Sequence, residues 1–155
     1  MLFANILVPD ENNLNGTLPS EISQLRNLRQ LDFSYNSLQG TIPVSIGQLN
    51  ALEFLDLGTN NFTGPIPEGL FNLTNLLSVN LADNWFSGTL SKSWGKLQNL
   101  QGIVLYWNIL SGPIPDEIGM LDRLCKYWFL SCAMVVYLST FDIHTSSHVL
   151  LIAGS

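Results

Sequence analysis

The sequence predicts a repeat solenoid, in which copies of a 24-residue unit stack and each copy adds one strand to a parallel β-sheet. Two observations lead to this prediction. Single residue types return every 24 residues. Each copy also holds a short segment of alternating apolar residues, the periodicity of a strand with one buried face. The recurring columns are Asn12, Asn36, Asn60, Asn84 and Asn108; Gly16, Gly40, Gly64, Gly88 and Gly112; and Leu25, Leu49, Leu73, Leu97 and Leu121.

The predicted strand of each copy is defined by a pair of apolar residues two positions apart. These pairs are Leu31 and Phe33, Leu55 and Leu57, Val79 and Leu81, and Ile103 and Leu105. A strand this short cannot bury its apolar face alone, so it must lie beside the strand of the next copy. Because each copy returns in the same direction, the sheet is expected to be parallel. Five strands spaced by about 4.8 Å would make a sheet about 20 Å wide.

The residues after each strand suit a turn that encloses part of its own backbone. The recurring asparagine carries both a donor and an acceptor, so it can satisfy backbone groups inside the turn. Glycine four residues later tolerates backbone shapes that other residues resist, and proline three residues after that fixes φ. In the fourth copy the apolar-proline pair is replaced by Leu90-Ser91.

A further apolar column belongs to the limb that returns to the next strand. It consists of Ile22, Ile46, Leu70, Trp94 and Ile118. Because Trp94 is much larger than its counterparts, we expect a local bulge in the fourth copy.

Composition excludes several classes of function. The 155 residues are 12% charged with a net charge of −6, and the six basic residues are scattered. Nucleic-acid binding needs clustered Lys and Arg and is therefore not expected. The sequence holds no glycine-rich phosphate loop, nucleophile elbow or metal-binding signature, so we predict a protein that is not an enzyme and needs no cofactor.

The repeat pattern resembles a known family. Residues 52–67 read LEFLDLGTNNFTGPIP, which is similar to the plant-specific class of leucine-rich repeat found in receptor-like kinases, receptor-like proteins and polygalacturonase-inhibitor proteins. The resemblance covers about residues 4–124. It implies a leucine-rich repeat solenoid: a curved right-handed superhelix with a parallel concave β-sheet, a convex side of 3-10 turns and loops, and a second small sheet on one flank.

The two ends depart from the family pattern. We divide the chain into repeats over residues 1–126, the first copy incomplete, and an apolar tail without repeats over residues 127–155. The N-terminus shows no signal peptide and no cysteine-paired cap, so we interpret the chain as a truncated receptor-like ectodomain or a short relative of one. Three interpretations of the tail stay open: a C-terminal cap, a membrane-associated segment through residues 127–153, or a segment with no selected role.

The tail also contains candidate metal ligands and thiols. Cys125 and Cys132 would lie about 23 Å apart on an extended strand, beyond disulfide reach, so we predict free thiols. His144 and His148 have the spacing of two ligands on one helix face, but no third ligand accompanies them, and no metal site is expected.

In this family the concave face usually binds the partner, and the resemblance places ten of our candidate residues there. They are Arg29, Gln30, Asp32, Tyr35, Phe54, Asp56, Asn80, Asp83, Tyr106 and Trp107. Asp32, Asp56 and Asn80 share one column and should form a polar ladder, while exposed aromatics commonly anchor interfaces. The alternative is that the acidic residues only maintain solubility and the aromatics only fill gaps between copies.

Three N-glycosylation sequons begin at Asn15, Asn61 and Asn72, and none uses the asparagine column. Together with the resemblance, they indicate an extracellular or plasma-membrane-associated protein. The predicted function is a receptor-like module that recognises a peptide or protein, with a related receptor as a further partner, in extracellular signalling or defence. The alternative is a soluble inhibitor or scaffold that binds a partner enzyme, as polygalacturonase inhibitors do.

Overall fold

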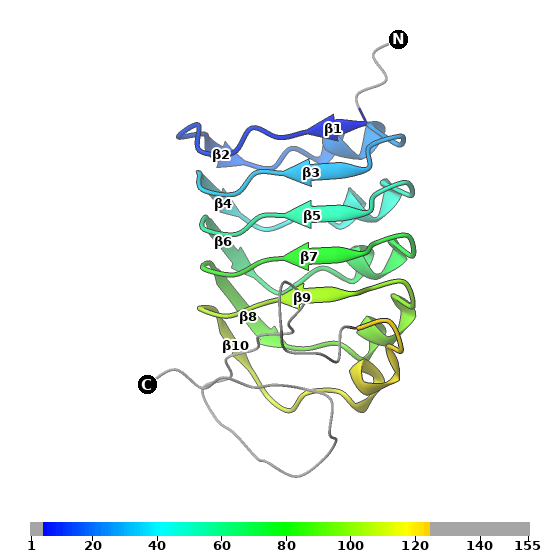
Figure 1. Ribbon diagram of the computed structural model, residues 1–155. Coiled ribbons are helices and arrows are strands. Elements are labelled where there is room, and N and C mark those ends of the chain that lie inside the picture. Colours follow the sequence, from blue (N-terminus) through cyan, green and yellow to red (C-terminus); the bar gives the residue numbers. More distant parts are fainter. Residues whose placement is uncertain (1–4, 125–155) are drawn as a thin grey trace, which may run out of the picture.

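The computed structural model describes residues 5–124, which form two five-stranded parallel sheets and five short 3-10 helices (Figure 1). The first sheet contains β1 (Ile6–Leu7), β3 (Gln30–Asp32), β5 (Phe54–Asp56), β7 (Ser78–Asn80) and β9 (Gly102–Val104). The second sheet contains β2 (Asn15–Thr17), β4 (Ser37–Gly40), β6 (Asn61–Gly64), β8 (Trp85–Thr89) and β10 (Ile109–Ser111). The helices are η1 (Ser20–Gln24), η2 (Val44–Gln48), η3 (Glu68–Asn72), η4 (Lys92–Lys96) and η5 (Asp116–Met120). The predicted boundary at residue 126 and the predictions on the tail lie outside the described residues.

The first sheet keeps the register that the sequence predicts. Leu31 lies opposite Leu55, Leu55 opposite Val79, and Val79 opposite Ile103, so neighbouring strands are one 24-residue copy apart. These four side chains are buried and belong to one continuous core. Figure 1 shows the strands of the first sheet stacked one above another, with the second sheet along one flank and the helices at the other end of the coils. The predicted solenoid, including its second sheet, is confirmed.

The asparagine column forms an internal ladder of hydrogen bonds. The Asn60 side chain donates to the Phe33 carbonyl oxygen of the preceding copy (2.8 Å) and accepts from the Leu38 N–H (2.9 Å). Asn36, Asn84 and Asn108 repeat this pattern. Each asparagine thus joins two copies, and it supplies the acceptor for a backbone N–H of the preceding copy. Asn12, at the start of the column, differs: its side chain is exposed and donates only to the Asp10 carbonyl oxygen.

The glycine and proline columns adopt the predicted conformations. All five column glycines have positive φ, between 77° and 91°. Pro19, Pro43, Pro67 and Pro115 each precede a 3-10 helix. Ser91 replaces proline with nearly the same angles, φ −74° and ψ 144°, and its hydroxyl accepts a hydrogen bond from the Ser93 N–H. The fourth copy therefore keeps the shape without the ring, since the serine caps the helix.

The local bulge predicted at Trp94 lies between η3 and η4, which pack less closely than the other neighbouring helices, whereas the backbone of η4 itself is regular. The helix η4 has five residues like the other four helices, and Leu97 after it has φ −85° and ψ 61°, close to the φ −80° and ψ 63° of Leu73 after η3. Trp94 is fully buried, and its ring meets the Phe71 ring edge to face with centroids 5.1 Å apart. The two rings occupy the wider space between η3 and η4, and the buried indole N–H has no hydrogen-bond partner.

Candidate protein-binding face

The polar ladder Asp32–Asp56–Asn80 runs along the first sheet in adjacent strands. Asp32 lies opposite Asp56, and Asp56 opposite Asn80. The Asn80 amide donates to both carboxylate oxygens of Asp56, each at 3.0 Å. These side chains also close their own turns, because each accepts the N–H two residues later, as Asp56 does from Gly58 at 2.9 Å. The ladder is therefore part of the fold as well as part of the surface.

Asp56 has a perturbed ionisation within this ladder. Burial disfavours the charged carboxylate and is the largest influence, and it raises the pKa of Asp56 above its ordinary value of 3.8. The negative charge of Asp32 acts in the same direction, while hydrogen bonds from Gly58 and Asn80 oppose it. The charged form of Asp56 is therefore less favoured in the folded chain than in water.

The neighbouring column on the same sheet changes its size and chemistry from copy to copy. Gln30, Phe54, Ser78 and Gly102 lie opposite one another in successive strands. Phe54 is 44% exposed and projects where its neighbours are polar or small. Beside it, Arg29 and Glu53 form an exposed ion pair at 2.9 Å, a pair that contributes little to stability. These residues confer a varied chemical character on an otherwise uniform sheet.

Tyr35, Asp83 and Trp107 lie in the turns just after the first-sheet strands and not on the strands themselves. All three, together with Thr59, have positive φ between 52° and 55°, a left-handed conformation that costs energy for residues with a side chain. Tyr35 and Trp107 are 62% and 67% exposed, and the Tyr106 and Trp107 rings meet edge to face at 5.2 Å. Of the predicted aromatic residues, Tyr35, Tyr106 and Trp107 therefore line one border of the sheet, while Phe54 lies on β5.

Trp85 and Ile109 are exposed apolar residues that the sequence analysis did not select. They begin β8 and β10, and Trp85 is 58% exposed. Their column reads Asn13, Ser37, Asn61, Trp85 and Ile109. The change from polar to apolar residues in the last two copies was the available signal. The Asn84 N–H donates to the Trp107 carbonyl oxygen at 3.0 Å, so the residue before Trp85 contacts the Trp107 turn of the next copy.

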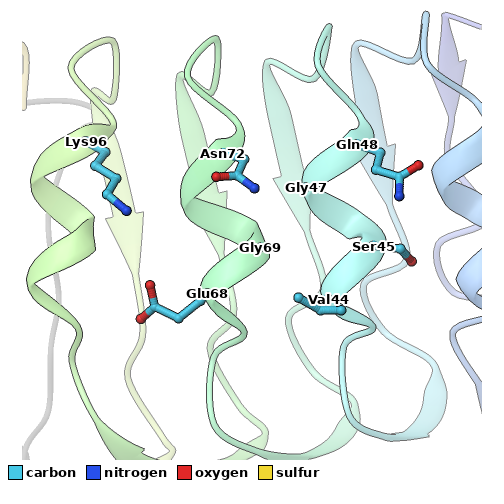
Figure 2. Close-up of a pocket in the computed structure, with 8 residues that line it drawn as sticks. All are labelled: Val44, Ser45, Gly47, Gln48, Glu68, Gly69, Asn72 and Lys96. Carbon is cyan, nitrogen blue, oxygen red and sulfur yellow. The ribbon is translucent and has the colours of Figure 1, made fainter.

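A shallow hollow of about 510 Å³ lies on the helical side, away from the first sheet (Figure 2). It is lined by Val44, Ser45, Gly47, Gln48, Glu68, Gly69, Asn72 and Lys96. The pKa of Glu68 is lowered, chiefly by a hydrogen bond from Ser91, with smaller contributions from Ser93 and Lys96. The hollow is open to solvent, and its charged groups are an exposed carboxylate and an amine, so its geometry does not indicate catalysis.

Residues 5–124 hold no group of three or more His, Cys, Asp or Glu side chains that could bind a metal. Within the same residues no helix is long and apolar enough to cross a membrane. The predictions on Cys125, Cys132, His144 and His148, and on membrane association through residues 127–153, fall outside the described residues.

Sequence comparison agrees with this architecture. The leucine rich repeat family model matches residues 6–62, and the same columns continue to Leu124. The chain is a leucine-rich repeat solenoid, and its repeats are similar to the plant-type class. No curated protein matches its sequence.

Solved structures of plant leucine-rich repeat ectodomains have the same fold as this chain over most of its length. The Arabidopsis receptor kinase HAESA, in complex with the peptide hormone IDA and the co-receptor SERK1, is 34% identical with a TM-score of 0.76. The alignment covers 86% of this chain and 23% of that one. The ectodomain of the receptor kinase SOBIR1 from Arabidopsis thaliana is 36% identical with a TM-score of 0.72, covering 76% and 65%.

A third similar structure has a different function. A plant ice-binding protein is 34% identical, with a TM-score of 0.73 over 76% of this chain and 38% of that one. In all three comparisons this leucine-rich repeat chain spans less than two thirds of the other protein. The scaffold is therefore shared by proteins with different tasks, and function has to be argued from the surface residues.

Proposed function

We propose that the first sheet is the binding face of a recognition module and takes a peptide or protein segment laid across its strands. One observation carries the proposal: the residue type is nearly constant between copies on the buried face of this sheet and varies between copies on the outward face. The buried face repeats an aliphatic residue in every copy, as Leu31, Leu55, Val79 and Ile103 do. The outward column Gln30, Phe54, Ser78 and Gly102 varies in size and polarity. The fold does not require that variation, whereas selective recognition of a partner does.

The exposed aromatic residues supply the anchors for such a partner. Phe54 projects from the middle of the sheet, and Tyr35 and Trp107 stand at its border. Large aromatic side chains dominate the energetics of protein interfaces, while surrounding polar groups exclude water and fix register. The ladder of Asp32, Asp56 and Asn80 provides those polar groups beside Phe54.

The comparisons support a peptide or protein as the class of ligand. HAESA is bound to a peptide hormone and a co-receptor in its structure, and SOBIR1 is a receptor kinase. By extension, we place this module outside the cell or at the plasma membrane, in signalling or defence, with a related receptor as a second partner. The alternative is a soluble inhibitor that binds a partner enzyme through the same face.

The experiment starts from linear peptides selected against the full chain in a random display library. The Tyr35→Ala/Trp107→Ala double variant should weaken the selected peptides by at least about tenfold, because each truncated anchor is worth roughly 1–2 kcal/mol. The control is Val44→Ala/Met120→Ala, which removes two equally exposed apolar side chains from the helical side. The proposal is overturned if the selected peptides lose affinity for the Val44→Ala/Met120→Ala variant and keep their affinity for the Tyr35→Ala/Trp107→Ala variant.

The same proteins separate the two candidate functions. An inhibitor should slow a purified fungal polygalacturonase in a reducing-end assay, and the Tyr35→Ala/Trp107→Ala variant should lose that effect. A recognition module for signalling should leave the hydrolase rate unchanged while still binding peptides.

A further inference from the structure

Three exposed apolar side chains gather on one flank of the fourth and fifth copies. Trp85 begins β8, Ile109 begins β10, and Trp107 stands in the turn just before β10. All three are more than half exposed. The fold does not require them, since the positions equivalent to Trp85 and Ile109 are polar in the first three copies. A contiguous exposed apolar patch commonly marks an interaction surface.

Hydrogen bonds between the two copies bring Asp83 and Trp85 beside the Trp107 turn. The Asp83 N–H donates to the Tyr106 carbonyl oxygen at 2.9 Å, and the Asn84 N–H donates to the Trp107 carbonyl oxygen at 3.0 Å. Asn84 is buried, whereas Asp83 is half-buried and Trp85 is exposed. The side chains on either side of the buried asparagine therefore reach the surface next to Trp107.

Ile109 completes the same surface. It lies opposite Ser87 in the second sheet. Ser87 follows Trp85 by two residues, so their side chains lie on the same face of β8. Asp83, Trp85, Trp107 and Ile109 thus form one continuous surface, which we call the flank patch.

The segments that build this flank carry only negative charges within residues 5–124. In every copy, the segment from the first-sheet strand to the end of the second-sheet strand contains no lysine or arginine. The carboxylates of these segments are Asp10, Glu11, Asp32, Asp56 and Asp83. The basic residues of the described chain all lie in the limbs that hold the helices and return to the next strand: Arg26, Arg29, Lys92, Lys96 and Arg123. A partner for this flank is therefore expected to be positively charged, because complementary potentials favour association.

We propose that the flank patch binds a segment of a partner protein that presents an arginine or lysine side chain between aliphatic neighbours. Guanidinium and ammonium groups are attracted to the face of an indole ring, and the patch exposes two indoles, those of Trp85 and Trp107. Asp83 supplies the opposite charge, and no ion pair within residues 5–124 involves it. Ile109 contacts the aliphatic neighbours of the basic residue.

Other occupants fit the flank patch less well. A second copy of this chain has a net charge of −6 and presents the same carboxylates, so the two copies repel each other. An anionic membrane surface attracts basic segments and repels this one. A neutral apolar partner would cover the Asp83 carboxylate without giving it a hydrogen bond or a counter-charge, which is costly.

The flank patch is separate from the proposed binding face and does not rest on it. Trp85 and Ile109 begin strands of the second sheet, whereas Phe54 projects from the first sheet. Trp107 stands at the border between them. Substitutions of Trp85 and Ile109 therefore address the flank patch alone, and a substitution of Phe54 addresses the first sheet alone.

The test is to titrate the isotope-labelled full chain with the peptide acetyl-LRLRL-amide and to follow the indole N–H signals by NMR. The signals of Trp85 and Trp107, assigned from single Trp→Phe variants, should shift in a saturable way, and that of the buried Trp94 should not. The same peptide with citrulline in place of arginine keeps the shape and loses the charge. It should bind at least about fivefold more weakly.

Protein variants locate the peptide. Trp85→Ala/Ile109→Ala should weaken the arginine peptide by at least about fivefold, because it removes one indole and the aliphatic contact. Asp83→Asn should weaken it about threefold at low salt, and asparagine suits the positive φ of this position, so the turn is kept. Val44→Ala/Met120→Ala on the helical side is the control and should leave the affinity unchanged.

Absence of any shift, or equal affinity for the arginine and citrulline peptides, would overturn the proposal. Self-association that Trp85→Ala/Ile109→Ala abolishes would assign the patch to a second copy and overturn it too. Binding that is lost in Phe54→Ala and kept in Trp85→Ala/Ile109→Ala would place the peptide on the first sheet, against the flank patch and in favour of the proposed function. Binding with the opposite response supports the flank patch whatever the library peptides show, so the two proposals can fail separately.

Discussion

Asn84→Ala tests whether the asparagine ladder holds the copies together. The Asn84 amide donates to the carbonyl oxygens of Leu57 (2.9 Å), Leu81 (3.3 Å) and Ala82 (3.1 Å). Its oxygen accepts from the Phe62 N–H at 2.9 Å, and the residue is 6% exposed. Alanine removes all four hydrogen bonds at once.

The expected cost comes mainly from the Phe62 N–H. Each of the three carbonyl groups keeps a second donor, namely the Asn60 amide, the Asn108 amide and the Thr59 N–H. The Phe62 N–H loses its acceptor in a buried place, which costs about 1–3 kcal/mol. With the weaker loss at the carbonyl groups, we expect the free energy of unfolding to fall by about 2–4 kcal/mol.

The matched control is Asn12→Ala in the same column. Asn12 is exposed, and its side chain makes one hydrogen bond, to the Asp10 carbonyl oxygen, so its replacement should cost less than about 0.5 kcal/mol. Urea unfolding of the full chain, followed by circular dichroism, measures both variants. A cost for Asn84→Ala no larger than that for Asn12→Ala would refute a structural role for the ladder.

Two further predictions concern packing and charge. Gly69→Ala should destabilise the chain by about 1–3 kcal/mol, since an added Cβ would overlap the Val44 carbonyl group and force η2 and η3 apart. Gly119→Ala, whose Cβ would meet nothing within 4 Å, should be neutral in the same urea assay; equal costs would contradict the close contact of η2 with η3. Asp56→Asn should stabilise the chain more at pH 7 than at pH 4. The raised pKa means that folded Asp56 binds its proton more tightly than unfolded Asp56 does. The contribution of Asp56 to the free energy of unfolding therefore falls as pH rises above the ordinary pKa of 3.8. A gain that is the same at both pH values would show that ionisation of Asp56 does not affect stability.

The repeat columns were sufficient to predict the solenoid because each column has one local task. Asn36 and its counterparts satisfy backbone groups, Gly40 and its counterparts take positive φ, and Leu31 and its counterparts are buried. Such tasks depend on the residue and its own turn, so they can be inferred from the chain. The size of Trp94 was sufficient to predict the wider spacing of η3 and η4, but its contact with Phe71 of the neighbouring copy could not be inferred from one column.

Surface features were harder to predict because they depend on where a turn directs its side chains. Tyr35 and Trp107 were assigned to the face of the sheet, whereas positive φ places them in the turn beyond it. Trp85 could not be predicted from the apolar pairs of the first-sheet strands, because it begins a strand of the second sheet. The close contact of Gly69 with Val44 joins two helices one copy apart and has no signature within one repeat.

The most direct test of a ligand-binding first sheet is a crystal structure of the full chain with one of the selected peptides. We expect the peptide to lie across β3, β5 and β7, with contacts to Phe54 and to the Asp32–Asp56–Asn80 ladder. A peptide seated on the second sheet or in the hollow beside η3 would contradict it.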